Sequence, residues 1–493
     1  MKVQQIKDGA QKLLKQSGLF KTNLPFLLCA SLLQAENFEN FHSYKSTQQK
    51  SYQKFADARD NGFGAYLQEQ FKEYKAHIGE PFYEEPKPKQ ITPMTPQNIK
   101  AVGPKIFLQH PSIKETPAKK IPVEILKKEE KKKDIEFDFY GTSLAFDVDE
   151  KIRNTSFYPQ TQVGIGTFFN AMAASAYAPL VADINAVIVE MQLNDWGVYL
   201  LVDVISKKVY KDEDAGKLFA WFIFNKLGYD ARVGLAQKKI TLMHYSQKDI
   251  YDTPNYSFGG KKFYALSEYA KGKAKPLYSY EKSYPNAIKA LDLSLEKLPK
   301  LTLNEKRKTL RYQNDGKSFA FDYIYNQNLI DFMGTYPQAD YEIYFNTPMD
   351  SISYNSLLDG LQKEIDGKSA SLALNFILNF VQNAFIYEVD QTHFGREKVM
   401  FAQETLFFDK SDCEDRSILF ASLVKDFFGY GVVGIKYKNH MATGLYIPML
   451  GDSVEAAGRR FVIADPTYIN ATIGQSMPKY LSQTPERFII VKK

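Results

Sequence analysis

Residues 411–430 read SDCEDRSILFASLVKDFFGY, and this stretch decides how the second half of the chain is expected to fold. Its apolar residues recur at helical spacing up to Phe427, and Gly429 follows as a residue type that commonly ends a helix. The pattern predicts a helix that begins at Cys413. A thiol at that position lies beside unpaired backbone N–H groups and the positive end of the helix dipole, which both favour a thiolate.

Two acidic residues follow the cysteine directly. In the first turn of a helix, Glu414 and Asp415 complement the dipole, so by themselves they indicate only a helix start. Next to a thiolate they would raise its pKa. We therefore expect their carboxylates to point away from Cys413 and to bind backbone groups or Arg416.

The same pattern occurs earlier in the chain. A shift of 201 residues aligns residues 213–229 with 414–430, and seven of these seventeen positions are identical, where chance gives about one. A second correspondence follows, since Gly-Lys-Lys-Phe at 260–263 matches Gly-Arg-Arg-Phe at 458–461. Two unrelated helices with similar core faces are the alternative to a repeat.

Strand-like segments at 137–148 and 341–347 precede the two matching helices. We therefore interpret residues 135–300 and 317–493 as two copies of one α+β domain. A repeat of this length indicates a duplicated folding unit rather than a short motif.

The segments that follow the second helix have the pattern of strands. Residues 431–437 and 441–447 are rich in β-branched and apolar residues, and His440 lies between them. A loop at 448–458 leads to another strand that ends just before Asp465. Antiparallel pairing about the middle of that loop places His440 opposite Asp465.

A thiolate nucleophile needs a base, and the base needs a group that orients it. We expect Cys413 to be the nucleophile, His440 the base and Asp465 the orienting carboxylate. Gln403 precedes the cysteine by ten residues and is a candidate oxyanion-hole donor beside the backbone N–H of Cys413; an ordinary loop side chain is the alternative. Singly, each of these residues is more often structural than catalytic, so the prediction depends on their order and register.

The first copy tests this prediction within the same chain. At the shift of 201 residues, Cys413 corresponds to Asp212 and His440 to Lys239. Counted from the Gly-Lys-Lys-Phe match, Asp465 corresponds to Ser267. None of these side chains can perform the corresponding role in the triad. The first copy is therefore predicted to keep the fold without the chemistry, as a packing partner or as a wall of the substrate groove.

The order of these motifs is similar to that of the transglutaminase-like superfamily. Asp-Cys-Glu-Asp at 412–415, a helix, a Gly-Tyr break, His440 on a strand and Asp-Pro-Thr at 465–467 resemble its core. Gln-Glu-Thr-Leu at 403–406, followed by the cysteine motif, is similar to bacterial transglutaminase-like cysteine peptidases. The resemblance implies two papain-like α+β domains, the first degenerate and the second with a Cys, His, Asp triad.

The expected activity is acyl transfer on a protein or peptide amide. Attack by the Cys413 thiolate gives a thioester, which water hydrolyses or an amine converts into a cross-link. The resemblance favours hydrolysis, by a peptidase or amidohydrolase. The alternatives are a cross-linking transglutaminase and a non-catalytic cell-envelope scaffold. The sequence contains no metal-ligand cluster, phosphate-binding glycine loop or dinucleotide fingerprint, so we expect no metal and no cofactor.

The N-terminal region predicts export and an arm. Residues 1–35 contain lysines and then a short apolar run, the layout of a signal sequence, with a buried helix as the alternative. This predicts a periplasmic or secreted protein. Residues 36–82 have aromatic residues at helical spacing, and Gly62 and Gly64 lie where the phase of that spacing changes. We expect a helical hairpin that packs internally or against a partner.

Residues 83–134 are rich in proline and lysine, which predicts a disordered linker. It is interpreted as a solvated spacer, or as a basic tether to an anionic component of the cell envelope. Much of the excess lysine behind the net charge of +6 lies in this segment. The folded parts are then near neutral, which argues against nucleic acid as a partner.

Overall fold

The computed structural model describes residues 54, 56–81, 87–88, 90–109, 133–269, 271, 275–314 and 316–492. Residues 1–62 and 63–493 are separate compact units, and the elements below belong to the second unit. The predicted signal segment, residues 1–35, lies outside the described residues. The fold is mixed α+β, as the alternation of helical and strand patterns predicts.

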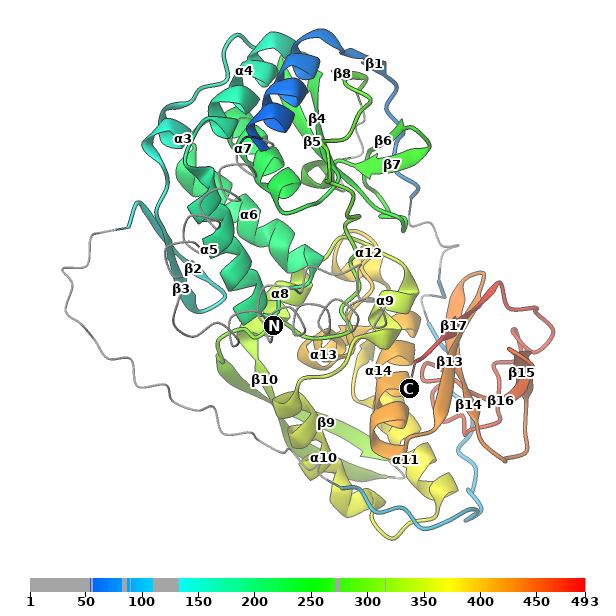
Figure 1. Cartoon of the computed structure of the whole chain (residues 1–493). Coiled ribbons are helices and arrows are strands. Elements are labelled where there is room, and N and C mark those ends of the chain that lie inside the picture. The colour runs from blue at the N-terminus through cyan, green and yellow to red at the C-terminus, as the bar shows by residue number, and fades with distance from the viewer. Residues whose placement is uncertain are drawn as a thin grey trace, which may run out of the picture. The chain divides into compact units, whose positions relative to one another are not determined.

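The first half consists of a small hairpin, a group of helices and an antiparallel sheet (Figure 1). The hairpin strands are β2 (Ile135–Phe139) and β3 (Thr142–Phe146), and the helices are α3 (Glu150–Asn154), α4 (Gln162–Ala173), α5 (Tyr177–Glu190), α6 (Asp195–Val209) and α7 (Glu213–Lys226). The sheet has the strand order β1-β8-β4-β5-β7-β6. These strands are β1 (Lys72–Tyr74), β4 (Ala231–Ala236), β5 (Lys239–Tyr245), β6 (Asn255–Phe258), β7 (Lys261–Tyr264) and β8 (Leu277–Ser279), with the short helix η1 (Leu266–Glu268) after β7.

The second half begins with the long hairpin of β9 (Glu305–Asn314) and β10 (Lys317–Asn326). Its helices are α8 (Gln327–Gly334), α9 (Tyr341–Asn346), α10 (Ser351–Ile365), α11 (Ala370–Asn383), α12 (Asp390–His393), α13 (Ala402–Phe407) and α14 (Cys413–Phe428), and the short strands β11 (Ile386–Tyr387) and β12 (Lys410–Ser411) pair in parallel. The second sheet has the order β15-β16-β14-β13-β17. Its strands are β13 (Gly431–Tyr437), β14 (His440–Tyr446), β15 (Ser453–Ala456), β16 (Arg459–Ala464) and β17 (Arg487–Ile490).

The two sheets have the same strand order. Read from one edge, β8-β4-β5-β7-β6 of the first sheet corresponds to β17-β13-β14-β16-β15 of the second. In each half one buried helix packs against the two central strands, α7 against β4 and β5 and α14 against β13 and β14. Figure 1 shows α7 and α14 beside these strands. A helix that is apolar on most of its surface has to be covered on several sides, which explains this central position.

Strand register follows the sequence correspondence. Ala231 pairs with His244 in the first sheet, and Val432 pairs with Leu445 in the second, so both hairpins are related by the shift of 201 residues. The next pairing changes the shift, because Tyr264 and Val462, the partners of His244 and Leu445 on the following strand, differ by 198. This is the shift between the Gly-Lys-Lys-Phe and Gly-Arg-Arg-Phe turns.

The Leu-Phe-Ala segments at 218–220 and 419–421, which match at the shift of 201 residues, are buried in both halves. Leu218 and Phe219 are fully buried on α7, as are Leu419 and Phe420 on α14. Burial of one such side chain contributes about 1.5–3 kcal/mol, so these positions are strong determinants of the helix orientation. The glycine after α14, Gly429, has φ 68° and closes the helix in the left-handed conformation.

The segment 341–347 was predicted as a strand, and this prediction is wrong. Residues Tyr341–Asn346 form α9, and the side chain of Asp340 accepts a hydrogen bond from the backbone N–H of Glu342 as its N-cap. A short apolar run has no periodicity that separates helix from strand, and here the cap and the packing decide. The hairpin in the corresponding place is β9–β10, so a domain boundary at 317 would divide paired strands.

The predicted helical hairpin at 36–82 is also wrong where it is described. Residues 56–69 form one helix that continues through Gly62 and Gly64, and the chain then enters β1. A Cβ atom at Gly64 would lie 1.7 Å from Oδ1 of Asn170 on α4. Gly64 therefore permits a close approach between helices and does not mark a turn.

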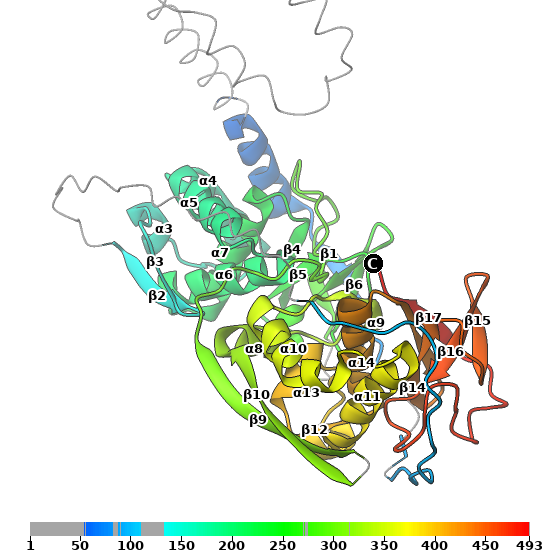
Figure 2. The same cartoon turned by 90° about the horizontal axis from the view of Figure 1, so that it is seen from below.

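The predicted disordered linker, residues 83–134, is ordered over much of its described part. Residues 90–109 are an extended chain along the second half, seen in Figure 2. The backbone N–H of Met94 donates to the carbonyl of Ile469, and that of Ile106 donates to the carbonyl of Lys368. Leu108 is buried. The segment is ordered because its backbone hydrogen bonds and the packing of Ile91, Ile106 and Leu108 attach it to a core that other residues form.

Among the described residues no single helix is long and apolar enough to cross a membrane. The pair α4 and α5 reaches the required length and composition together, but the two helices are bent by 82° at their junction.

Candidate active site around Cys413, His440 and Asp465

His440 and Asp465 are in direct contact. His440 is the first residue of β14 and follows a two-residue turn, while Asp465 follows the last residue of β16. The distance between Nε2 of His440 and Oδ2 of Asp465 is 2.7 Å, and both side chains are buried. The predicted pair is therefore brought together by the second sheet.

The register that joins them differs from the expected one. Thr443 pairs with Ala464, so extending the ladder places Asp465 opposite Ala442 rather than opposite His440. The segment 448–458, which was expected to be a loop, contains β15, and β15 pairs with the edge of β16 opposite to β14. Residues two positions apart on a strand point to the same face, so a shift by two leaves the two side chains on one face of the sheet.

Asp465 is held in place by the chain that follows it. Its Oδ1 accepts hydrogen bonds from the backbone N–H groups of Thr467 at 2.9 Å and Tyr468 at 3.2 Å. The carboxylate thus caps a local turn with one oxygen and binds the imidazole with the other. These bonds fix the orientation in which Oδ2 meets His440.

Tyr480 covers the imidazole ring. Its ring lies parallel to that of His440, with centroids 4.6 Å apart, and its hydroxyl donates to Oδ1 of Asn439 at 2.9 Å. Nδ1 of His440 is buried and has no hydrogen-bond partner among the described residues. The ring is therefore fixed through Nε2 and by stacking, and its second nitrogen remains available to a further group.

Cys413 is the first residue of α14, as predicted, and it is completely buried. Ser417, one turn along the helix, donates to the carbonyl of Met441 at 3.1 Å, which connects the start of α14 to the strand that begins with His440. Burial raises the pKa of Tyr480, and the nearby Cys413 and Asp465 raise it further. The thiol, the imidazole and the carboxylate are thus all neighbours of one tyrosine ring.

The thiol is hydrogen-bonded to an acidic side chain. Sγ of Cys413 lies 3.1 Å from Oε2 of Glu414. The expectation that both acids point away from the thiol is therefore wrong for Glu414. It is right for Asp415, which accepts the backbone N–H groups of Met400 at 2.9 Å and Asp412 at 3.3 Å.

Arg416 was the other expected partner of Glu414 and Asp415, but among the described residues its hydrogen bonds go to different groups. Its guanidinium donates to the hydroxyl of Ser411 at 3.1 Å and to the carbonyls of Gln382 at 3.2 Å and Phe385 at 2.7 Å. Burial lowers the pKa of Arg416 to about 10. The side chain fastens the start of α14 to the end of α11, so its role is in positioning the helix.

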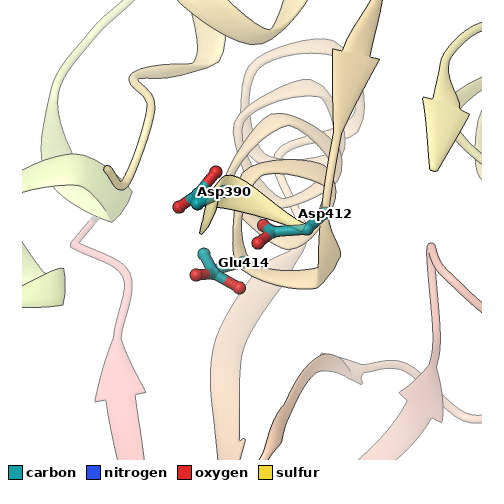
Figure 3. Close-up of side chains that lie close together, drawn as sticks. All are labelled: Asp390, Asp412 and Glu414. Atoms are coloured by element: carbon teal, nitrogen blue, oxygen red, sulfur yellow. The ribbon is translucent and has the colours of Figure 1, made fainter. Parts of the chain in front are cut away.

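A cluster of carboxylates lies next to the thiol. Figure 3 shows the side chains of Asp390, Asp412 and Glu414 directed toward one another, and one oxygen from each lies within 4.8 Å of the others. The ammonium group of Lys87 binds in this cluster, 2.8 Å from Asp412 and in contact with Glu414. These three carboxylates are the group among the described residues that could hold a cation.

Burial changes the proton affinity of the cluster. It raises the pKa of Asp412 and of Asp415 to about 7, with the neighbouring carboxylates adding to the effect and Lys87 opposing it. Burial also raises the pKa of Asp390 well above its ordinary value, and Asp412 and Asp415 raise it further. The start of α14 is therefore a region of crowded, incompletely neutralised carboxylates.

These pKa values predict how stability depends on pH. Asp412 and Asp415 bind protons more tightly in the folded state than in the unfolded state, where their pKa is about 3.9. The free energy of unfolding should therefore fall as pH rises from about 4 to about 7, and change little above that range through these groups.

Asp415→Asn should flatten this dependence, because it removes one of the titrating groups while keeping a side-chain oxygen for Met400 N–H. Denaturant unfolding of both proteins at several pH values measures the effect. An equally steep pH dependence in the variant would show that Asp415 does not titrate in this range.

The side-chain amide nitrogen of Gln403 bonds to Asp350 and not to Cys413, His440 or Asp465. Gln403 lies on α13, is buried, and donates from Nε2 to the carboxylate of Asp350, the N-cap of α10. This contact uses one of the two N–H groups of the amide, and an oxyanion hole would use the other.

The corresponding positions of the first half lack this arrangement. Asp212 is the N-cap of α7 and accepts the backbone N–H of Ala215, while Lys239, in the place of His440, lies 3.2 Å from Oδ2 of Asp214. Ser267 lies in η1. These side chains serve helix capping and ion pairing, and no nucleophile and base are brought together.

No sequence pattern predicted three residues of the site: Lys87, Asp390 and Tyr480. Lys87 lies in the stretch that was interpreted as a linker, and Tyr480 lies in the irregular segment between β16 and β17. No local pattern marks either residue. For Asp390 the only available signal was an acidic residue ahead of a short turn, which is common.

No protein-family model matches this chain, and comparisons with curated proteins and with solved structures give no significant match.

Proposed function

We propose that the second half is a cysteine-nucleophile hydrolase of peptide or protein amides, of the transglutaminase-like, papain-like type. The observation that carries the proposal is the contact of 2.7 Å between His440 and Asp465 beside the helix start that bears Cys413. A buried carboxylate on one imidazole nitrogen holds the tautomer in which the other nitrogen is a base. The unpartnered Nδ1 of His440 is the nitrogen that would take the thiol proton.

The reaction would proceed by two acyl transfers. Nδ1 of His440 accepts the proton of Cys413, and the sulfur attacks the amide carbonyl to form a tetrahedral oxyanion. The C–N bond then breaks, the imidazolium protonates the leaving amine, and a thioester remains. Water, deprotonated by the same imidazole, hydrolyses the thioester and restores the thiol. The backbone N–H of Cys413 at the helix start is available to stabilise the oxyanion.

Transfer of the acyl group to an amine, which gives a cross-link, is the second outcome that this arrangement permits. The same thioester serves both reactions, and access of water or amine decides between them. We favour hydrolysis because the sequence motif around Cys413 resembles that of bacterial transglutaminase-like cysteine peptidases. Export to the periplasm or secretion, with a possible cell-envelope partner, completes this proposal.

The first half is proposed to be a degenerate copy of the second. Support comes from the common strand order, the paired registers and the two matching sequence turns. In this interpretation Asp212, Lys239 and Ser267 occupy the places of a lost triad. The first half would then contribute packing or a wall of the substrate groove.

Alkylation of Cys413 as a function of pH tests the proposal. Cys29→Ser removes the other cysteine of the chain, so that iodoacetamide reports on Cys413 alone. An ordinary thiol reacts with a midpoint near its pKa of about 8.5, whereas a thiolate–imidazolium pair reacts well below it. His440→Ala should move the midpoint upward. A thiol with an ordinary midpoint in both proteins would favour the alternative of a non-catalytic scaffold.

A further inference from the structure

The side chain of Lys87 occupies the acidic site in the way that a bound cation would. It lies far ahead of the second half in sequence, yet its side chain is only 3% exposed. Its ammonium group binds Asp412 at 2.8 Å, Glu397 at 3.2 Å and Glu414 at short distance. A lysine is rarely buried to this degree unless its charge is neutralised by acidic partners.

Any cation that fits, and not only the ammonium group of Lys87, would compensate the negative charge of this site. Asp390, Asp412 and Glu414 are all buried, and Oδ1 of Asp412 has no hydrogen-bond partner among the described residues. Buried carboxylates are costly unless a positive charge or hydrogen bonds compensate them. If Lys87 leaves, another cation is needed in the same place.

This cation site is connected to the candidate nucleophile by one carboxylate. Glu414 contacts the ammonium group of Lys87 with Oε1 and the thiol of Cys413 with Oε2 at 3.1 Å. Whatever ammonium group occupies the site is therefore next to the sulfur. Since Cys413 is completely buried, a substrate can reach it only after some covering group moves.

We propose that this acidic site binds the side-chain ammonium group of a lysine in the substrate, and that Lys87 occupies it as a competitor within the chain. The inference rests on the proposed function and names its substrate class: lysine-containing peptides or proteins. The bound ammonium is a recognition element. Surrounding carboxylates keep it protonated, and a protonated amine cannot attack a thioester.

An ammonium group fits this site better than a divalent metal. Ca²⁺ requires six to eight oxygen ligands and Mg²⁺ a near-octahedral set of them. The cluster offers three carboxylates, and one oxygen of Glu414 is already bound to the thiol. An ammonium group can donate three hydrogen bonds, and that of Lys87 binds acceptors on Glu397, Asp412 and Glu414.

Lys87 is also attached in a way that allows exchange. The chain after it, residues 90–109, is extended and is held by hydrogen bonds such as Met94 to Ile469 and Ile106 to Lys368, and Leu108 is its one buried apolar side chain. A segment with few buried apolar side chains can separate from the domain more readily than a core element. A substrate lysine would then replace one ammonium group with another.

Chemical rescue tests the inference without any need for activity. Lys87→Ala should leave a cavity for an ammonium group and lower the melting temperature. Addition of butylammonium ions should raise that temperature in proportion to the logarithm of their concentration, because they bind only the folded state. Lys100→Ala, which removes an exposed lysine of the same segment, is the matched control and should show neither effect.

Three outcomes of the rescue are informative. Rescue by butylammonium but not by tetramethylammonium, Mg²⁺ or Ca²⁺ supports the proposal. Rescue by a divalent metal alone would assign the cluster to a metal and overturn it. Loss of stability that no cation restores would overturn it too, since Lys87 would then be a purely structural residue.

Thiol-directed reagents separate recognition from simple gating. In the Cys29→Ser background, Lys87→Ala should increase the rate of modification by cationic aminoethyl methanethiosulfonate about tenfold more than that by the neutral methyl reagent. Lys100→Ala should change neither rate. Equal acceleration by both reagents would mean that Lys87 only blocks access. These readouts hold even if Cys413 proves not to be catalytic, so the two proposals can fail independently.

Discussion

Replacing Cys413 with alanine should abolish amide hydrolysis, with a loss on the order of 10⁵-fold or more. In the proposed mechanism the sulfur is the atom that forms the thioester, and no neighbouring group in the described site can replace it as a nucleophile. The measurement is turnover of a lysine-containing peptide, together with trapping of the acyl-enzyme by mass spectrometry in the unmodified protein.

The structure also sets the stability expected of this variant. Cys413 is completely buried and its thiol donates to Glu414, so alanine loses both packing and one hydrogen bond. We expect a cost of about 1–2 kcal/mol. Cys413→Ser keeps a donor for Glu414 and serves as the control, being equally inactive but closer to the unmodified protein in stability. Substantial turnover by a folded alanine variant would remove Cys413 from the reaction.

Asp465→Asn should lower the rate by about 10⁴-fold with little change in substrate binding. The amide keeps an oxygen for the backbone N–H groups of Thr467 and Tyr468, so the turn should survive. Its nitrogen, however, cannot accept a hydrogen bond from His440. The imidazole then loses the partner at 2.7 Å that holds the reactive tautomer.

Asp465→Ala provides the comparison that separates catalysis from structure. This variant loses both the turn and the imidazole contact, and we expect it to be less stable than Asp465→Asn. For both variants, kcat, KM and the melting temperature are measured and compared with those of the unmodified protein. If the asparagine variant keeps full activity, Asp465 is a turn residue only; if both variants lose stability equally, the assumed survival of the turn is wrong.

The sequence specified the helix and hairpins around the site because their signals are local. The apolar spacing before Gly429 predicts α14, and its start at Cys413 agrees with the observed first residue. The strands on either side of His440 follow from β-rich segments interrupted by a short turn. Periods of 3.6 and 2.0 residues require only neighbouring residues to be read.

The match between the two halves of the chain also predicted features of strand pairing. Paired residues in the hairpin β4–β5 and in the hairpin β13–β14 differ by 201 positions. Paired residues in β6–β7 and in β15–β16 differ by 198 positions, as the sequence match does. The contact of His440 with Asp465 was also predicted, although its register was wrong by two residues. The alternation of side chains made that error harmless, since both registers place the two residues on one face.

Other parts of the molecule could not be predicted because they depend on contacts between distant segments. Residues 341–346 are apolar enough for either a helix or a strand, and packing decides for α9. Gly64 has the residue type of a turn, yet it serves the close approach of α4. Residues 90–109 belong to the proline- and lysine-rich stretch 83–134, which has the composition of a linker, but the surface of the second half orders them.

The sequence by itself therefore determined the elements that carry Cys413, His440 and Asp465 and the side of the sheet on which the last two meet. Only the tertiary structure placed Lys87 among the carboxylates, Tyr480 on the imidazole and the amide of Gln403 on Asp350. The physical reason is the distance along the chain between the residues that interact. Helices and hairpins are specified by residues a few positions apart, whereas a buried charge finds its partners wherever the folded chain brings them.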